Sequence, residues 1–153
     1  MARALSNRRV VVDGVTFQVQ RDRETSQRLA GVKRADTEPE RAVRATLVSL
    51  GWRCRATNRD LPGSPDLTNR PAKWAVFVHG CFWHRHAGCY KATTPKRNTA
   101  FWLAKFENNV ARDRRAARAL RREGYRVIVV WECQTRDPNA LRRRLHRLVG
   151  RYG

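Results

Sequence analysis

Acidic residues are scarce in this sequence of 153 residues, which holds 13 Asp and Glu against 33 Lys and Arg. The formal net charge is therefore +20. So large a positive excess leaves a polyanion as the natural partner, with nucleic acid as the leading candidate. Arginine outnumbers lysine, which suits bidentate contacts to phosphate, although GC-rich coding produces the same bias. The charge by itself therefore indicates binding and is weak evidence for cleavage.

Long apolar runs are absent as well. No stretch is long enough to cross a bilayer, and the first residues lead into Asn7-Arg8-Arg9 rather than into the apolar core of a signal peptide. We therefore expect an intracellular protein without a membrane partner. Cysteine occurs only four times, and in a reducing compartment these thiols would be free to bind metal. The length is that of one ordinary domain, so one core has to support both binding and chemistry.

The N-terminal part shows a hairpin pattern. Two β-branched runs, over residues 10–12 and 15–19, flank Asp13-Gly14, a dipeptide typical of tight hairpin turns. A loose tail is the alternative. Residues 21–36 are polar and basic, and we expect an arm there, with one helical turn, that could lie along DNA.

The rest of the chain alternates helical and strand patterns. Thr37-Glu38-Pro39-Glu40 supplies an N-cap, a first-turn proline and a capping-box glutamate, and Gly51 ends that helix. Apolar runs predict strands over 52–56, 74–78 and 125–131, and helical spacing predicts helices over 98–122 and 137–149. On the long helix we expect Phe101 or Trp102, Phe106, Val110, Ala117 and Leu120 to face inward. This order indicates an α/β fold with a small mixed central sheet flanked by helices.

The segment from His79 to Cys89 is the densest chemical signal. Cys81, His86 and Cys89 are separated by four and then two residues, and Cys133 follows the last apolar strand directly. Thiolates and one imidazole suit a structural, tetrahedral Zn²⁺ site. His84 could take the place of His86, and two buried cysteines with an exposed histidine are the metal-free alternative. Cys54 is left over, and we expect it to be a buried thiol.

If His86 binds zinc, two other histidines remain free. His79 ends a predicted strand and His84 lies across a tight turn, which suits proton transfer at a phosphodiester, although both can be ordinary hydrogen-bonding residues. Asp66, which enters a strand after Pro65, is the candidate metal-binding carboxylate, with a simple turn residue as the alternative. Pro-Asp before a catalytic pair on the next strand is the skeleton of restriction-endonuclease-like sites. Here Phe77-Val78-His79 stands in place of the usual acidic-x-Lys.

Several strings of residues together resemble the very short patch repair (Vsr) DNA mismatch endonucleases. They are Leu61-Pro62-Gly63-Ser64-Pro65-Asp66, Phe77-Val78-His79-Gly80-Cys81-Phe82-Trp83-His84-Arg85-His86, Phe101-Trp102, Asn109-Val110, Arg112-Asp113-Arg114-Arg115 and Val129-Val130-Trp131-Glu132-Cys133. The resemblance covers roughly Ser26 to the C-terminus, and the His-Gly-Cys-Phe-Trp-His string is far more selective than a short loose motif. It divides the chain into an N-terminal extension or arm over 1–25 and an endonuclease domain over 26–153 with a restriction-endonuclease-like fold.

The resemblance also implies roles for individual residues. Asp66 and the main-chain carbonyl of Val78 would hold catalytic Mg²⁺, and His84 is the expected general base. His79 and Glu40 would orient metal-bound waters, although the capping position explains Glu40 without catalysis. The structural Zn²⁺ would be held by Cys81, His86, Cys89 and Cys133.

The implied DNA contacts are apolar. Phe82, Trp83 and Trp102 match aromatic side chains that wedge into the duplex beside a T:G mismatch, and Leu29 matches an apolar residue that enters from the other groove. A core role is the alternative for Trp102.

The expected activity is nicking of one strand next to a T:G mismatch, the lesion left by deamination of 5-methylcytosine. A nuclease without mismatch preference, in defence or on a mobile element, is one alternative, and a zinc-stabilised DNA-binding module without cleavage is another. We expect a monomer in the bacterial cytoplasm, at the nucleoid, with repair proteins as partners.

Overall fold

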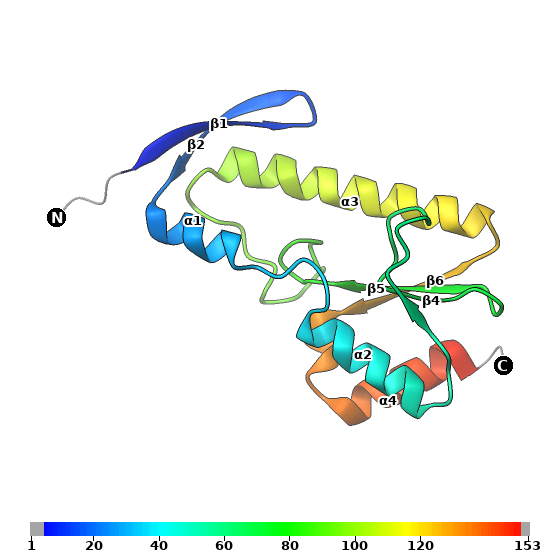
Figure 1. The fold of residues 1–153 in the computed structure, drawn as a ribbon. Helices are drawn as coiled ribbons and strands as arrows, with labels where there is room; N and C mark the ends of the chain where they lie inside the picture. Colours follow the sequence, from blue (N-terminus) through cyan, green and yellow to red (C-terminus); the bar gives the residue numbers. More distant parts are fainter. Residues whose placement is uncertain (1–4, 151–153) are drawn as a thin grey trace.

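A small mixed sheet lies at the centre of the computed structural model, which describes residues 5–150 (Figure 1). Residues 1–4 of the predicted N-terminal extension and residues 151–153 of the predicted endonuclease domain lie outside this range. The strands are β3 (Arg55–Ala56), β4 (Leu67–Asn69), β5 (Trp74–His79) and β6 (Arg126–Trp131), in the order β3-β4-β5-β6. The first three strands pair antiparallel, whereas β5 and β6 pair parallel, with His79 opposite Trp131. The predicted mixed sheet flanked by helices is therefore confirmed.

Parallel pairing of β5 and β6 brings two chemically important chain ends to one edge of the sheet. His79 is the last residue of β5, and Cys133 lies in the short 3₁₀ helix η1 (Glu132–Thr135) that follows β6. Because parallel strands end at the same edge, segments far apart in sequence meet there. This edge carries the candidate site.

Helices cover both faces of the sheet. Helices α2 (Glu38–Ser49) and α4 (Pro138–Val149) pack on one face, and α3 (Thr99–Arg122) packs on the other (Figure 1). Alternate residues of β5 serve the two layers, since Val76 packs with α2 and α4 and Phe77 packs with α3. The predicted strand covered on both faces is confirmed.

The predicted helix ends agree with the structure. Thr37 caps α2, and its Oγ1 accepts from the Glu40 N–H. Asp137 caps α4 in the same way. Gly51 and Gly124 both have positive φ, at +84°, a conformation that glycine adopts without strain as a helix ends.

Two predictions about strands and helix faces need correction. The strand predicted over 52–56 is confined to Arg55–Ala56, because the Asn69 side chain donates to the Arg53 carbonyl where a ladder hydrogen bond would otherwise form. On α3 the buried alanine is Ala116, and Val110 and Ala117 are only partly buried. Ala116 packs against the loop at Gly63, where an added Cβ would lie 2.5 Å from the Ala116 Cβ.

The N-terminal hairpin is also confirmed. Strands β1 (Ser6–Val12) and β2 (Val15–Arg21) pair antiparallel around Asp13 and Gly14, which both have positive φ. Helix α1 (Arg23–Ala30) follows and has eight residues, longer than the single turn expected. The Asp22 carboxylate caps this helix by accepting from the Thr25 N–H, and Leu29 packs on the buried cluster that includes Phe101 and Trp102. None of the helices described in residues 5–150 is both long enough and apolar enough to span a membrane.

Candidate active site

Asp66 lies just before β4, with its carboxylate directed at the end of β5. Its Oδ2 accepts a hydrogen bond from the Val78 N–H at 2.6 Å. Burial raises the pKa of Asp66 to about 6, and the negative charge of Glu40 adds to the increase, although the Val78 N–H and His84 oppose it. A half-buried carboxylate whose ionisation is disfavoured in this way is suited to a bound cation.

His79 and His84 lie face to face beside this carboxylate. Their rings stack with centroids 4.0 Å apart and an interplanar angle of 5°, as the sequence predicted for a pair across a tight turn. His79 is 8% exposed, and burial, followed by the neighbouring His84, lowers its pKa to about 4. His79 is therefore neutral at physiological pH.

Asp113, on α3, is the residue that sequence reasoning missed. Its Oδ2 lies 2.5 Å from the Nδ1 of His84. A carboxylate at Nδ1 favours the tautomer with the proton on that nitrogen, which leaves Nε2 as the nitrogen able to accept a proton. The available signal was one acidic residue within an arginine run.

Glu40 combines a capping role with a place in the site. Its Oε1 accepts from the Thr37 hydroxyl at 3.0 Å, and Thr37 in turn caps its N–H. Its charge also acts on Asp66, and it lines the cavity described below. The Glu40 carboxylate thus contacts the hydroxyl of the capping residue Thr37, without the bond to the Thr37 backbone N–H that a full capping box would have within the described residues, and it also faces the site.

Three thiols and one imidazole converge next to the histidine pair. The ligand atoms of Cys81, His86, Cys89 and Cys133 all lie within 4.8 Å of one another. His86 Nδ1 is 3.6 Å from the Cys81 Sγ and 3.4 Å from the Cys133 Sγ, and its ring stacks on Trp131 at 4.3 Å. Three sulfur donors and one nitrogen donor fit a structural tetrahedral metal site. Because His84 is held by Asp113, His86 is the histidine available to this cluster.

Two further observations concern Cys81, which belongs to this cluster, and Cys54, which does not. The Glu132 carboxylate, paired with Lys91, accepts from the Cys81 N–H at 3.2 Å, and so ties the end of β6 to the segment after β5. Cys54 is partly buried rather than fully buried, and it packs at the margin of the α2/α4 core. Its thiol takes no part in the cluster.

The four residues expected to contact bases gather in one cluster. Phe82 lies 5.0 Å from Trp83 and 5.6 Å from Trp102, between ring centroids, and Leu29 of α1 packs on the same group. Trp102 is only 9% exposed. Trp102 therefore lies among core residues, whereas Phe82 and Trp83 are partly exposed.

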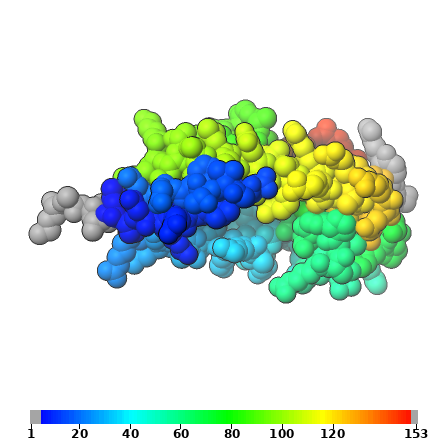
Figure 2. Space-filling view, turned by 90° about the horizontal axis from the view of Figure 1, so that it is seen from above, coloured from blue at the N-terminus to red at the C-terminus, as the bar shows by residue number. Residues whose placement is uncertain are grey.

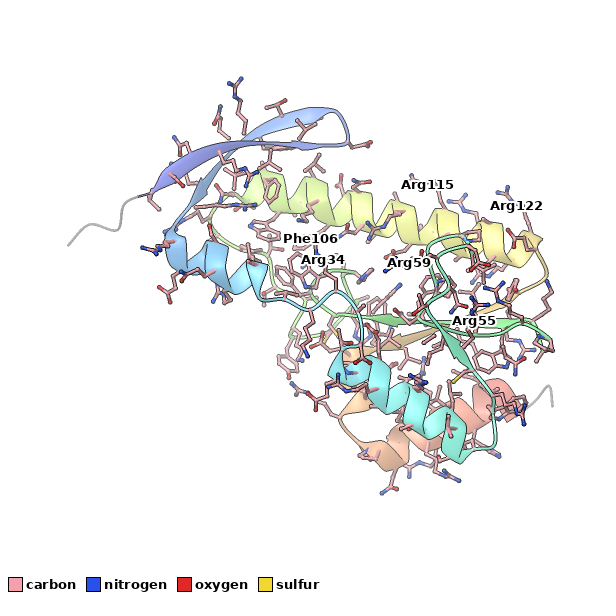
Figure 3. The ribbon with its side chains drawn as sticks, in the orientation of Figure 1. Arg34, Arg55, Arg59, Phe106, Arg115 and Arg122 are labelled. Atoms are coloured by element: carbon pink, nitrogen blue, oxygen red, sulfur yellow. The ribbon has the colours of Figure 1, made fainter. Side chains whose placement is uncertain are left out.

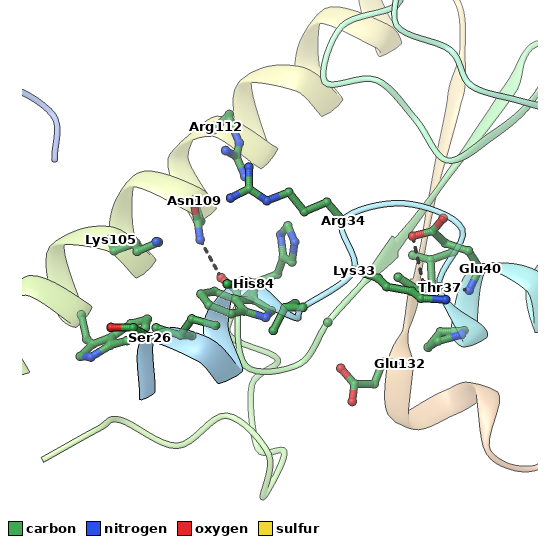
Figure 4. Close-up of a pocket in the computed structure, with 18 of the residues that line it drawn as sticks. Ser26, Lys33, Arg34, Thr37, Glu40, His84, Lys105, Asn109, Arg112 and Glu132 are labelled. Atoms are coloured by element: carbon green, nitrogen blue, oxygen red, sulfur yellow. Dashed lines mark hydrogen bonds between the residues drawn. The ribbon is translucent and has the colours of Figure 1, made fainter. Parts of the chain in front are cut away.

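A cavity of about 830 Å³ connects His84 with the aromatic cluster (Figure 4). Glu40, His84, Trp83 and Leu29 line it, from α2, the segment after β5, and α1. Its basic lining residues are Arg21, Lys33, Arg34, Lys105 and Arg112.

Lys105 is a further cavity residue that sequence reasoning missed. Its ammonium lies 5.5 to 5.8 Å from the ring centroids of Trp83, Phe101 and Trp102. Burial lowers the pKa of Lys105, and the positive charges of Arg21 and Arg34 lower it further. A cation held beside the aromatic cluster is placed for contact with a phosphate or a base edge.

Exposed arginines continue beyond the cavity. Figure 3 shows Arg115 and Arg122 on α3, with Arg55 in β3 and Arg59 in the loop after it. Within residues 5–150, none of these four forms a salt bridge with an acidic side chain. The basic surface around the cavity is therefore available to phosphates.

Comparisons with known proteins agree with this geometry. Residues 17–91 match the sequence model of the family described as DNA mismatch endonuclease Vsr. The chain is 46% identical over 118 residues to the type II nicking enzyme V.XorIIP of Xanthomonas oryzae, an alignment that covers 77% of this chain and 86% of that enzyme. It is 39% identical over 116 residues to the DNA mismatch endonuclease Vsr of Escherichia coli, covering 76% and 74%. The chain therefore belongs to the Vsr family of DNA endonucleases.

Proposed function

We propose that this endonuclease nicks one strand of duplex DNA next to a T:G mismatch, in a reaction that depends on Mg²⁺. The observation that carries the proposal is one cavity that is lined both by His84 and by the aromatic cluster. His84 stacks on His79 and contacts Asp113, and Asp66 accepts from the N–H of Val78, which lines the same cavity. The Escherichia coli relative is named as a DNA mismatch endonuclease, which supports the same substrate. The nick would begin repair of deaminated 5-methylcytosine.

Asp66 and the main-chain carbonyl of Val78 are the residues that would hold the Mg²⁺. The Asp66 carboxylate already lies against the Val78 peptide group, and no lysine or arginine in residues 5–150 neutralises it through a salt bridge. When bound, the ion would balance the negative charge of the phosphate and of the leaving oxygen.

His84 acts in this proposal as the general base toward the attacking water. Asp113 holds its Nδ1 and stabilises the protonated ring, so Nε2 accepts the proton. His79 stays neutral, stacks on the His84 ring and, with Glu40, orients water in the site. The stacked pair thus divides the work between a proton acceptor and a neutral positioning ring.

Zinc is the metal that we propose for the site of Cys81, His86, Cys89 and Cys133. The donor set fits Zn²⁺, and the site joins the segment after β5 to η1. Its role is to keep His84 in place between His79 and Asp113. We further propose a restriction-endonuclease-like fold for residues 26–153, with residues 1–25 as an extension to it.

Recognition is assigned to the aromatic cluster and the arm. Phe82, Trp83 and Trp102 would enter the duplex beside the mismatch, with Leu29 entering from the opposite groove. Unstacking costs a few kcal/mol per base step and less at a weakened pair, so wedging favours mismatched DNA. A monomer acting in the bacterial cytoplasm, with repair proteins acting on the nick, completes the proposal.

The test is a nicking assay on T:G, T:A and C:G duplexes of one sequence, with Mg²⁺ or without a divalent ion. The wild type should nick only the T:G duplex, and only with Mg²⁺. Asp66→Ala and His84→Ala should lose nicking, whereas His146→Ala, an exposed histidine on α4, should retain it. Equal nicking of all three duplexes would instead indicate a nuclease without mismatch preference. Two relatives are named only as nicking enzymes, and their names carry no mismatch preference. DNA binding without cleavage would contradict the catalytic assignment.

A further inference from the structure

The N-terminal hairpin has one face that the proposed function leaves unused. Strand pairing places Asn7 opposite Gln20, Arg9 opposite Gln18, and Val11 opposite Thr16. Directly paired residues of an antiparallel ribbon point to the same side. All six of these residues are exposed, so they form one solvent-facing surface, which we call the ribbon face.

The opposite side of the hairpin is fixed to the body of the protein. Val12 and Val19 are buried against α3, and the Phe17 ring meets the Phe101 ring edge to face with centroids 6.0 Å apart. Trp102 belongs to the same cluster. The hairpin therefore packs in the same cluster as the side chains assigned to mismatch recognition.

Hydrogen bonds also fasten the base of the hairpin. Asn98 accepts from the Gln20 N–H at 3.0 Å and donates to the Gln20 carbonyl at 2.8 Å. Asp22 pairs with Arg97 at 2.9 Å. These bonds use backbone groups of β2 and the cap of α1, whereas the side chains of Arg9, Gln18 and Gln20 make no hydrogen bond within residues 5–150. The ribbon face is held in place while its own polar groups remain available.

The composition of the ribbon face suits one kind of partner. Asparagine and glutamine present a donor and an acceptor together, arginine donates to phosphate or to guanine, and no acidic residue lies on this face. Of the three arginines between residues 5 and 21, Arg9 lies on this face and the other two lie on the opposite side, and Asp13 in the turn is the one acidic residue in that stretch. A two-stranded ribbon fits the major groove of duplex DNA, and seven residues span about 23 Å, close to seven base pairs.

The hairpin also lies next to the cleft that would receive DNA. In Figure 2 it runs beside α3 and α1. Arg21, the last residue of β2, lines the same cavity as His84, and strand alternation places its side chain on the side of the hairpin opposite the ribbon face. We propose that the ribbon face is a second DNA-contacting surface, which binds the duplex beyond the nicked site and lengthens the bound stretch on one side. This inference rests on the proposed action on duplex DNA.

The test measures binding to T:G duplexes of two lengths by fluorescence anisotropy without Mg²⁺. One duplex should extend about 30 base pairs, and the other about 12, so that it ends before the ribbon reaches it. The variant combines Arg9→Thr, Gln18→Thr and Gln20→Thr, because threonine preserves strand propensity. It should bind the long duplex about tenfold more weakly than the wild type and the short one equally well. Its hydroxyl-radical footprint should be shorter on one side.

The matched control is Arg143→Gln, which removes the same single positive charge from the exposed face of α4. An equal loss of affinity in this control would show a general charge effect and overturn the inference. Wild-type binding by the triple variant at both lengths, with an unchanged melting temperature, would overturn it as well, and would leave the hairpin a purely structural role. Nicking is scored separately. If the wild type nicks all duplexes equally, mismatch specificity is refuted. If the triple variant then has a shorter footprint than the wild type, the inference that the ribbon face binds DNA still stands.

Discussion

At the scale of single residues, the charged carboxylate of Asp66 carries a cost to the fold that a bound cation would offset. Its pKa is about 6, above the ordinary value of 3.8, because burial disfavours the charged form. The unfolded chain therefore ionises first as pH rises, so the free energy of unfolding falls between about pH 4 and pH 6 and stays lower above that range. At neutral pH the penalty is about 1 to 3 kcal/mol, allowing for partial exposure to solvent.

Asp66→Asn should therefore stabilise the zinc-loaded protein in the absence of Mg²⁺ while abolishing nicking. The stabilisation should be present at pH 7.5 and nearly absent at pH 4, as measured by urea unfolding at both values. Asp60→Asn is the control, because pairing with Arg70 lowers the pKa of Asp60 and its removal brings no gain. Equal stability of wild type and Asp66→Asn at pH 7.5 would refute the strain argument.

Asp113 is the residue whose role depends on another side chain. Asp113→Asn should lower the single-turnover nicking rate by about a hundredfold or more, because the amide no longer favours the required tautomer or stabilises the protonated His84 ring. DNA affinity and zinc content should stay near wild type. Glu107→Gln, an exposed neighbour on the same helix, should leave the rate unchanged. A wild-type rate for Asp113→Asn would remove His84 from the role of general base.

Sequence alone predicted the cluster of Cys81, His86, Cys89 and Cys133 because these residues follow a recognisable spacing. It could not decide between His84 and His86. The structure separates them through Arg85, whose φ of +57° turns the chain between the two histidines. Asp113 offered only the signal of one acidic residue within an arginine run, because its role arises only when α3 packs beside the segment after β5. A short sequence motif does not predict contacts of this kind between separate elements.

At the scale of elements, the sequence predicted boundaries best where local chemistry decides them. The Asp13-Gly14 turn and the caps Thr37 and Asp137 all lie where expected. The length of α1 and the reduction of β3 were missed, because packing on the aromatic cluster and the Asn69 side chain, respectively, override local propensity. The order of the elements also does not predict mismatch specificity or the identity of the metal, because both depend on contacts with DNA and with ions.

The cluster of Cys81, His86, Cys89 and Cys133 joins the segment after β5 to η1. Cys133→Ser should lose bound zinc, lower the free energy of unfolding by about 3 kcal/mol or more, and reduce nicking, because the His84 segment loses its tether. Zinc content is measured by a metal-release assay on the purified protein. Cys54→Ser is the matched control, since Cys54 lies outside the cluster and should keep the metal. Full zinc content in Cys133→Ser would exclude Cys133 as a ligand.

At the scale of the whole molecule, the net charge of +20 should make salt act in opposite directions on folding and on binding. Salt screens repulsion among the arginines, so the melting temperature of the free protein should rise between 50 and 500 mM NaCl. DNA affinity should fall over the same range, by about a thousandfold or more if six to ten phosphates are contacted. Calorimetry and anisotropy measure the two effects. A melting temperature that falls with salt would show that attractive pairs outweigh repulsion.

The short segment from His79 to Cys89 has a consequence for how this enzyme can change over evolutionary time. The roles proposed for its neighbouring residues are proton transfer, metal binding and contact with bases, and these residues pack together, so most substitutions there should disturb more than one task. Tolerance should be low along the whole segment in a deep mutational scan, and higher on the exposed face of the hairpin. Relatives that prefer different DNA would then differ mainly in their N-terminal residues, while the segment after β5 stays nearly constant.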